Sequence, residues 1–268
     1  MNILFLGDIV GDSGCMAIKE NLAQIIKNKY IDFVVANGEN AAKEGVGITE
    51  NITNELLNSG VDVITSGNHV WDQKETYDFI TKQNRLLRPL NLLKESPGKG
   101  FAVYSSRKGF KVGVLNLMGN IFMKKCNDVF IEAKKFLEKN KLKNQYDFLI
   151  VDFHGEITSE KMAMGHYFDG SATLFVGTHT HVPTNDARIL KNGTAYLTDA
   201  GMCGDYNSVI GMNTQNSLNR FFKKESVKHF PAKGKASLSG VIVKADPDNG
   251  LANKVDSFIF GGELKNIF

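Results

Sequence analysis

The chain alternates short runs of β-branched and aromatic residues with stretches whose apolar residues recur at helical spacing. In its first half we expect three strands, each followed by a helix, in the order Ile3–Leu6, Met16–Lys27, Ile31–Ala36, Asn51–Asn58, Val61–Thr65 and Lys74–Lys82. This alternation is typical of a mainly parallel sheet that is covered by helices. The sequence therefore predicts an α/β fold.

The second half continues this alternation and adds antiparallel pairs. A helix at Val129–Asn140 leads to a strand at Phe148–Phe153, and a helix at Ser159–Met164 leads to a strand at Ala172–Val176. Short turns join three expected hairpins, which pair Phe101–Ser105 with Lys111–Leu117, Asp186–Leu190 with Thr194–Thr198, and Ser239–Ala245 with Val255–Gly261. No linker, repeat or low-complexity tract divides the 268 residues, so residues 1–268 are predicted to form a single domain.

Residues that can bind metal ions follow five of the expected strands. The five blocks are Gly7-Asp8, Asn37-Gly38-Glu39-Asn40, Ser66-Gly67-Asn68-His69, His154-Gly155-Glu156 and Gly177-Thr178-His179-Thr180-His181. Open α/β sheets hold their ligands at the carboxyl ends of their strands, so one parallel sheet would gather these blocks at one edge. Along an extended strand, alternate residues share a face about 6.6–6.8 Å apart. His179 and His181 therefore suit two neighbouring metals, or a single metal if the chain turns.

Each block alone also has a plain structural explanation. Asp8 can cap a helix or a turn, Asn68 and His69 can cap the helix that follows, and His154 can be a buried histidine of the core. The coincidence of five blocks favours a metal site instead. Carboxylate, imidazole and amide ligands suit Mn²⁺, Fe or Zn²⁺, and the absence of cysteine disfavours a structural zinc site. Two ions bridged by a carboxylate are used to hydrolyse phosphate esters, and Glu39 is the natural bridge.

The five blocks resemble, in order and spacing, the five motifs of the calcineurin-like metallophosphoesterases. The chain is most similar to their YmdB-type branch, a group of bacterial phosphodiesterases. The supporting strings are Asn37-Gly38-Glu39-Asn40-Ala41-Ala42, Ser66-Gly67-Asn68-His69-Val70-Trp71-Asp72, and Thr198-Asp199-Ala200-Gly201-Met202 through Val209-Ile210-Gly211. This resemblance runs across nearly the whole chain. It implies a four-layer α-β-β-α sandwich, with mixed sheets inside and helices on the outer faces.

Three positions depart from the wider superfamily. Val10 stands where the first motif usually has a histidine, Glu39 stands where the second usually has an aspartate, and Val70 follows His69 in place of an acidic residue. The YmdB-type branch shows the same changes. They suggest that Asn40 fills the ligand position that Val10 leaves open.

The resemblance implies which residues bind which metal. The first ion would take Asp8, Glu39, Asn40 and His181, and the second would share Glu39 and take Asn68, His154 and His179. The expected cofactors are two divalent or trivalent ions, with Fe or Mn first and Zn or Mg as alternatives.

The resemblance also implies a reaction, the hydrolysis of small phosphodiesters and of 2′,3′-cyclic nucleotides in particular. A hydroxide that bridges two ions is nucleophilic at neutral pH, because metal binding lowers the pKa of water from about 15.7 towards about 7. His69 is placed to give a proton to the leaving alkoxide. Asp72 would then orient His69, or it would serve as an acidic residue at the start of a helix. The segment Gly119–Asn127 would border the active site or form a surface loop.

Two other functions are open on the same residues: a phosphomonoesterase or protein phosphatase, and a metal-binding regulatory or RNA-binding module. The net charge of +3, from 32 basic and 29 acidic residues, gives no sign of a nucleic-acid partner. Three widely spaced cysteines and a short apolar N-terminal run predict a cytoplasmic protein with no membrane span and no disulfide framework. An exposed apolar edge in the β-rich tail would favour a homo-oligomer.

Overall fold

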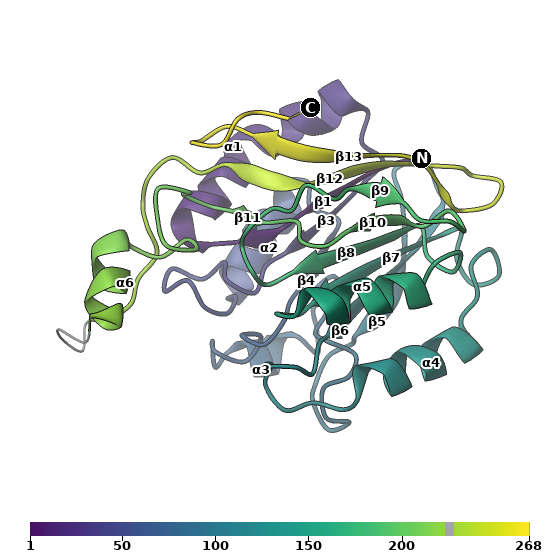
Figure 1. Ribbon diagram of the computed structural model, residues 1–268, viewed down its shortest axis with the longest axis horizontal. Helices are drawn as coiled ribbons and strands as arrows, with labels where there is room; N and C mark the ends of the chain where they lie inside the picture. The colour runs from purple at the N-terminus through teal and green to yellow at the C-terminus, as the bar shows by residue number, and fades with distance from the viewer. Residues whose placement is uncertain (223–227, 268) are drawn as a thin grey trace.

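The computed structural model describes residues 1–222 and 228–267, and most of its strands form two mixed sheets (Figure 1). The first sheet has, in spatial order, the strands β13 (Ala252–Phe260), β12 (Leu238–Ala245), β1 (Asn2–Leu6), β3 (Phe33–Asn37) and β4 (Val63–Thr65). The second has β5 (Phe101–Ser105), β6 (Lys111–Met118), β7 (Phe148–His154), β8 (Leu174–Thr178), β10 (Ala195–Leu197) and β9 (Arg188–Ile189). Two short strands, β2 (Asp8–Ile9) and β11 (Met202–Cys203), pair with each other.

Helices cover the outer face of each sheet. In chain order the helices are α1 (Gly11–Lys29), α2 (Glu50–Asn58), α3 (Thr76–Phe79), α4 (Val129–Lys139), α5 (Thr158–Tyr167) and α6 (Thr214–Phe221). Leu22 of α1 and Leu56 of α2 pack in one buried cluster with the first sheet, and Phe136 of α4 and Met164 of α5 pack in another with the second. The predicted α-β-β-α sandwich is therefore confirmed.

Strand β1 shows how the sequence builds these layers. Ile3 and Phe5 belong to the apolar cluster between the two sheets, whereas Leu4 and Leu6 belong to the cluster under α1 and α2. All four side chains are fully buried. Alternate residues of a strand point to opposite faces, so a strand that is covered on both sides reads as a continuous apolar run. Burying each such side chain contributes about 1.5–3 kcal/mol.

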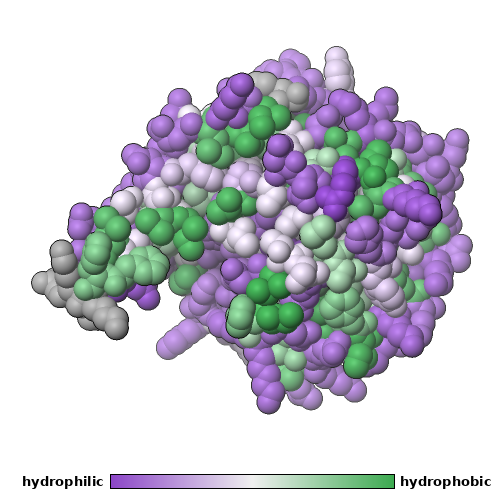
Figure 2. Space-filling model, in the orientation of Figure 1, coloured by the Kyte–Doolittle hydropathy of each residue, from purple (hydrophilic) through white to green (hydrophobic). Residues whose placement is uncertain are grey.

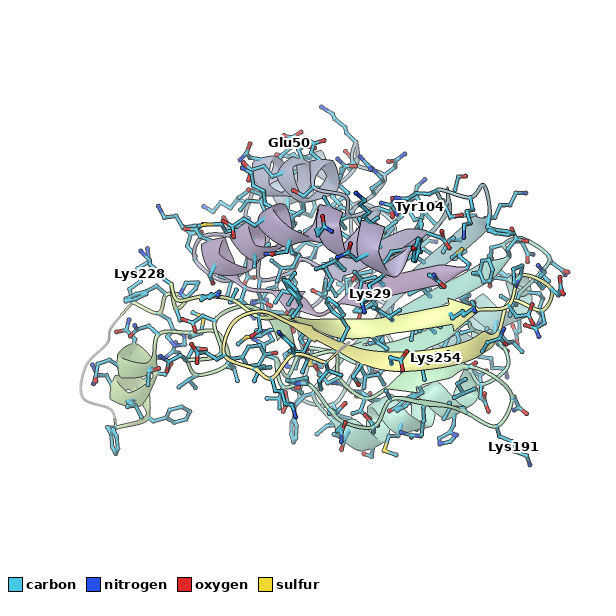
Figure 3. All side chains as sticks on the ribbon, turned by 90° about the horizontal axis from the view of Figure 1, so that it is seen from above. Lys29, Glu50, Tyr104, Lys191, Lys228 and Lys254 are labelled. Atoms are coloured by element: carbon cyan, nitrogen blue, oxygen red, sulfur yellow. The ribbon has the colours of Figure 1, made fainter. Side chains whose placement is uncertain are left out.

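The surface carries polar side chains, but the projecting helix α6 also exposes hydrophobic ones. Figure 3 shows the labelled side chains of Glu50 and Lys191 pointing outward from opposite sides of the molecule. Helix α6 projects from the body in Figure 1, and Figure 2 shows hydrophobic side chains gathered there. Leu218 and Phe221 of α6 are both exposed. Among the helices of the described residues, none combines the length and the apolar character that a membrane crossing requires.

Most of the predicted strands and helices are confirmed, and three of them differ in length. Helix α1 begins at Gly11 rather than Met16, because Gly14 lets the helix approach β11: a Cβ atom there would collide with the carbonyl oxygen of Cys203. The helix expected at Lys74–Lys82 shrinks to the four residues of α3, and hydrogen-bonded turns flank it. The strand expected at Asp186–Leu190 shrinks to β9.

A fourth correction concerns the sheet that carries the polar blocks. Strands β1, β3 and β4 lie in the first sheet, whereas β7 and β8 lie in the second. The blocks therefore come from two sheets rather than from one. They meet because the strands of both sheets end at the same edge of the sandwich.

Candidate metal centre

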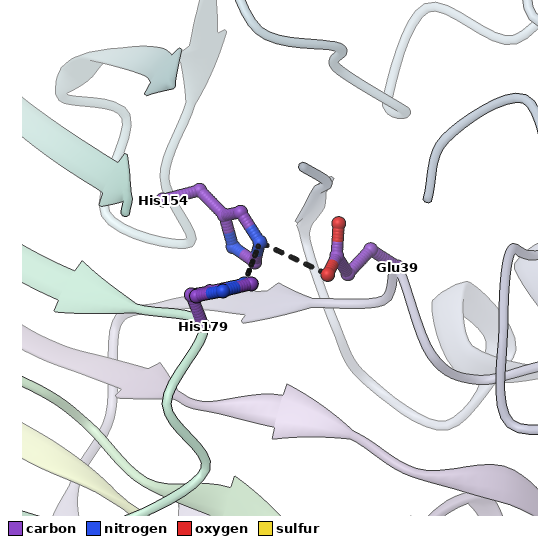
Figure 4. A group of neighbouring side chains, drawn as sticks. All are labelled: Glu39, His154 and His179. Atoms are coloured by element: carbon purple, nitrogen blue, oxygen red, sulfur yellow. Dashed lines mark hydrogen bonds and ion pairs between the residues drawn. The ribbon is translucent and has the colours of Figure 1, made fainter. Parts of the chain in front are cut away.

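Four ligand-type atoms converge at this edge, around Nε2 of His154. This nitrogen lies 2.9 Å from Oε1 of Glu39, 3.0 Å from Oδ1 of Asn68 and 3.0 Å from Nδ1 of His179. Figure 4 shows three of these four side chains pointing toward one another. Ligands that bind one ion at about 2.0–2.2 Å and near right angles lie about 3 Å apart. The spacing of the four atoms therefore fits a single cation, and Glu39, His154 and His179 form a group that could hold one.

Asp8 and Asn40 lie beside this group and leave two buried oxygen atoms without partners. Oδ1 of Asp8 is 3.7 Å from Nδ1 of His154 and 3.9 Å from Nε2 of His181. Asn40 is held next to Asp8's strand by a bridge to Val10, and its amide nitrogen donates to the carbonyl oxygen of Gly45 at 2.8 Å. Oδ1 of Asp8 and Oδ1 of Asn40 have no hydrogen-bond partner among the described residues. A buried acceptor without a partner is costly, and a bound cation would satisfy both.

Two imidazoles are oriented by acceptors on the far side of the ring. Nδ1 of His181 lies 2.8 Å from the carbonyl oxygen of Ile210, and Nε2 of His179 lies 3.1 Å from Oε2 of Glu156. A carbonyl or carboxylate oxygen only accepts, so each of these nitrogens carries the proton. The other nitrogen of each ring then presents a lone pair to the site. Metal-binding histidines adopt this arrangement, in which the outer N–H donates to a carboxylate or a carbonyl.

The His-x-His segment is not extended, so the 6.6–6.8 Å spacing of alternate residues in a strand does not apply to His179 and His181. His179 has a φ angle of 103° and His181 one of 64°, so the chain turns directly after β8. Such angles are strained for residues other than glycine and persist only where the surroundings enforce them. The amide of His179 donates to Oδ2 of Asp8 at 3.1 Å, and the amide of Thr180 donates to Oδ2 of Asp199 at 3.2 Å. Asp199 in turn pairs with Lys161 at 2.7 Å, and both side chains are buried.

The buried charges of the site depend on one another. Burial opposes the ionisation of Glu39, but the charge and hydrogen bond of His154 hold the pKa of Glu39 at about 2. Burial likewise opposes the charging of His154, yet Glu39 and Asp8 raise the pKa of His154 to about 9. Burial, together with the charge of His154, lowers the pKa of His179 to about 3. The carboxylates of the site thus require positive charge close to them.

His69 lies at the edge of the cluster, where its backbone amide donates to Glu39 and its ring contacts Asp72. Its Nδ1 lies 2.6 Å from Oδ2 of Asp72, and Lys124 donates to the other carboxylate oxygen at 3.0 Å. Partial burial acts to raise the pKa of Asp72, but the hydrogen bonds from His69 and Lys124 outweigh it and lower that pKa. Asp72 therefore orients His69, and α3 begins only at Thr76. The side chain of His69 is 29% exposed, so it is accessible from solvent.

Two further features of the site were open or missed in the sequence. The segment Gly119–Asn127 borders the site, because the amide of Gly119 donates to the carbonyl oxygen of His154 at 2.9 Å and Lys124 reaches Asp72. Glu156 received no role from the sequence, although it stands two residues after His154.

Gly67 is required by close packing: a Cβ atom there would collide with the ring of His154 and with the carboxylate of Glu39.

Comparison with known proteins agrees with this fold and shows the family. The family model described as "YmdB-like protein" matches residues 4–258. The 2′,3′-cyclic-nucleotide 2′-phosphodiesterase of Bacillus subtilis (strain 168) is 43% identical over 264 residues, which cover 98% of each chain. A crystal structure described as a novel phosphatase from Mycoplasma pneumoniae has a TM-score of 0.89 at 36% identity, over 97% of this chain and 93% of that one. A hypothetical protein from Thermus thermophilus has a TM-score of 0.90 at 38% identity, over 98% of this chain and 100% of that one.

Proposed function

This chain belongs to the YmdB-like family, and from that premise we propose that it is a metal-dependent phosphodiesterase that acts on 2′,3′-cyclic nucleotides. The expected enzyme class, a hydrolase of phosphoester bonds, is confirmed by its relatives. The observation that carries the finer proposal is the group of four ligand atoms around Nε2 of His154, together with the unpartnered oxygens of Asp8 and Asn40. The name of the Bacillus subtilis relative supports the substrate class.

The proposed ligand sets divide this group between two ions. Asp8, Glu39, Asn40 and His181 would hold the first ion, and Glu39, Asn68, His154 and His179 would hold the second. Fe, Mn and Zn ions all accept this mixture of carboxylate and amide oxygens with imidazole nitrogens, and we propose Fe or Mn, with Zn or Mg as alternatives. Ions bound there would supply the Lewis acidity that activates water and offsets the charge developing on the phosphoryl oxygens.

A side chain of the protein would donate the proton that the leaving group needs. His69 is the proposed donor, because its Nδ1 is held by Asp72 and its Nε2 is left for the substrate. Lys124 keeps Asp72 in place by binding its second oxygen. A histidine that is oriented by a carboxylate loses less entropy when it reaches the reacting oxygen, since its ring is already positioned.

The proposal extends to the whole chain and its location. Residues 1–268 would act as one domain, because the proposed ligands come from both sheets. The described cysteines, Cys15, Cys126 and Cys203, are free thiols. Free thiols are typical of the cytoplasm, where we propose that the enzyme works.

The experiment that tests the proposed function compares three substrates. Metal-stripped protein, resupplied with Mn²⁺ or Fe²⁺, is assayed on bis-p-nitrophenyl phosphate, on p-nitrophenyl phosphate and on 2′,3′-cyclic AMP. We expect metal-dependent turnover of the two diesters and little turnover of the monoester. Preference for the monoester would instead indicate a phosphatase. No turnover by protein that holds two metals would favour a regulatory module.

Glu156 offers a second test, which concerns metal binding alone. Glu156→Ala is expected to weaken Mn²⁺ binding by about 10–100-fold, because Nε2 of His179 loses the carboxylate that orients the ring. Glu156→Gln should recover part of this loss, since its amide oxygen can still accept from that nitrogen. Calorimetric titration of stripped protein with Mn²⁺ measures both. Glu132→Ala, which removes a carboxylate paired with Lys135 on the surface, is the control. Unchanged affinity in Glu156→Ala would contradict the orienting role.

A further inference from the structure

A buried polar network lies directly beneath the proposed metal centre, within the otherwise apolar layer between the two sheets. Asp152 accepts hydrogen bonds from Thr178 at 2.7 Å, from Thr65 at 2.5 Å and from Asn37 at 3.0 Å. All four side chains are fully buried. They join β7 and β8 of the second sheet to β3 and β4 of the first. None of these residues has a role in the site as described so far.

Stability alone does not explain the network. A carboxylate that is removed from water costs several kcal/mol, and replacing buried charged groups by apolar ones of similar volume is often neutral or stabilising. Asp152 stands in a strand whose other inward side chains, Phe148 and Ile150, belong to the apolar cluster between the sheets. His154 is the next inward residue after Asp152, since alternate residues of a strand share a face. The register also pairs His154 with Thr178 on β8.

The hydrogen-bond polarity of this network determines where His154 carries its proton. Thr178 has one hydroxyl proton, and it is directed to Oδ1 of Asp152, because a carboxylate only accepts. Oγ1 of Thr178 can then only accept from Nδ1 of His154, which lies 2.9 Å away. The proton of the neutral ring is therefore on Nδ1. Its Nε2 presents a lone pair to Glu39, Asn68 and His179.

We propose that Thr178 and Asp152 are positioning residues that fix the tautomer of His154 and thereby set the metal affinity of the site. The other tautomer would place a proton on Nε2, in the space where the four ligand atoms converge. A cation could then bind only after that proton had moved. This inference rests on the proposed metal centre, but the tautomer itself is a property of the metal-free protein.

The experiment has a measurement on the metal-free protein and one on metal affinity. The ¹⁵N chemical shifts of histidine-labelled, metal-free wild type, recorded above pH 9 where the ring of His154 is neutral, report which ring nitrogen carries the proton. The variant His154→Gln assigns the signals of this ring. We expect the proton on Nδ1 in the wild type and on Nε2 in Thr178→Val, which removes the hydroxyl at almost constant volume. We expect Mn²⁺ binding to weaken by about 10–100-fold in Thr178→Val, as for other groups that orient metal ligands, and to recover in Thr178→Ser.

The matched control is Thr65→Val. It removes another buried hydroxyl that donates to Asp152, but among the described residues Thr65 makes no hydrogen bond to His154. We expect it to leave the tautomer and the Mn²⁺ affinity close to those of the wild type. If Thr65→Val lost as much Mn²⁺ affinity as Thr178→Val, the network would have only a structural role and the inference would be overturned. A neutral His154 ring protonated on Nε2 in the wild type would also overturn it. If the tautomer and affinity results hold but the loaded wild type hydrolyses no diester, only the proposed function fails.

Discussion

Glu39→Gln is expected to fold normally, to bind fewer Mn²⁺ ions than the wild type, and to fall to the turnover of the chelated wild-type enzyme. Glu39 is the carboxylate that both proposed ions share, and it is 1% exposed. Its Oε1 lies 2.9 Å from Nε2 of His154, and its Oε2 accepts from the amide of His69 at 3.1 Å. Glutamine removes the negative charge and turns an N–H donor toward one of these positions. A cation is then both less attracted and directly opposed.

Thermal unfolding gives a readout of this change that does not need activity. A ligand that binds only the folded state stabilises it, by about 2.7 kcal/mol at a concentration one hundred times its Kd. The Tm of the wild type should therefore rise with added Mn²⁺ and fall on chelation, and this response should be lost in Glu39→Gln. Metal content by mass spectrometry gives the second measurement.

Asp32→Asn is the matched control for Glu39→Gln. Asp32 is also a buried carboxylate, 5% exposed, but it lies just before the start of β3, whereas Glu39 follows the end of that strand. Its partners are Lys108 and the amide of Asn2, far from the site along the strand. Asp32→Asn should keep the wild-type response to Mn²⁺. Wild-type metal content and turnover in Glu39→Gln would show that Glu39 is not the shared ligand.

The sequence predicts the strands, the helices and the polar blocks because these follow from local patterns, whereas the four layers follow from the family resemblance. It does not predict how β1 pairs, since a strand that is buried on both faces carries no sign of its neighbours. β1 pairs with β12, and Asn2 lies opposite Lys244, almost the whole chain away. Such pairing depends on the packing of all layers together. This is why the blocks were expected on one sheet and are found on two.

The sequence leaves open whether the His-x-His segment turns, for a similar reason. Its residues have no glycine or proline to signal a turn, and the unusual φ of His179 is enforced by Asp8 and Asp199, which come from distant parts of the chain. One residue of the buried polar network under the site can be recognised in the sequence. Asp152 is a charged residue inside the apolar run from Phe148 to Phe153, and aspartate is almost never fully buried unless it is paired.

His69→Ala is expected to keep the metal content of the wild type and to lower kcat on 2′,3′-cyclic AMP by about 10²–10⁴-fold, the usual contribution of a positioned proton donor. The side chain of His69 contacts Asp72 rather than the ligand cluster, and its backbone amide, which donates to Glu39, survives the substitution. Asp72→Asn should give a smaller loss, because it leaves the imidazole in place and weakens only its orientation.

The choice of substrate separates a proton donor from a group that merely shapes the site. The alkoxide released from a cyclic nucleotide needs a proton, whereas p-nitrophenolate leaves without one because it is a far weaker base. His69→Ala should therefore lose much more activity on 2′,3′-cyclic AMP than on bis-p-nitrophenyl phosphate. Equal losses on the two substrates would remove His69 from the role of donor. Loss of bound metal would instead make His69 a ligand, although its Nδ1 is already occupied by the contact with Asp72.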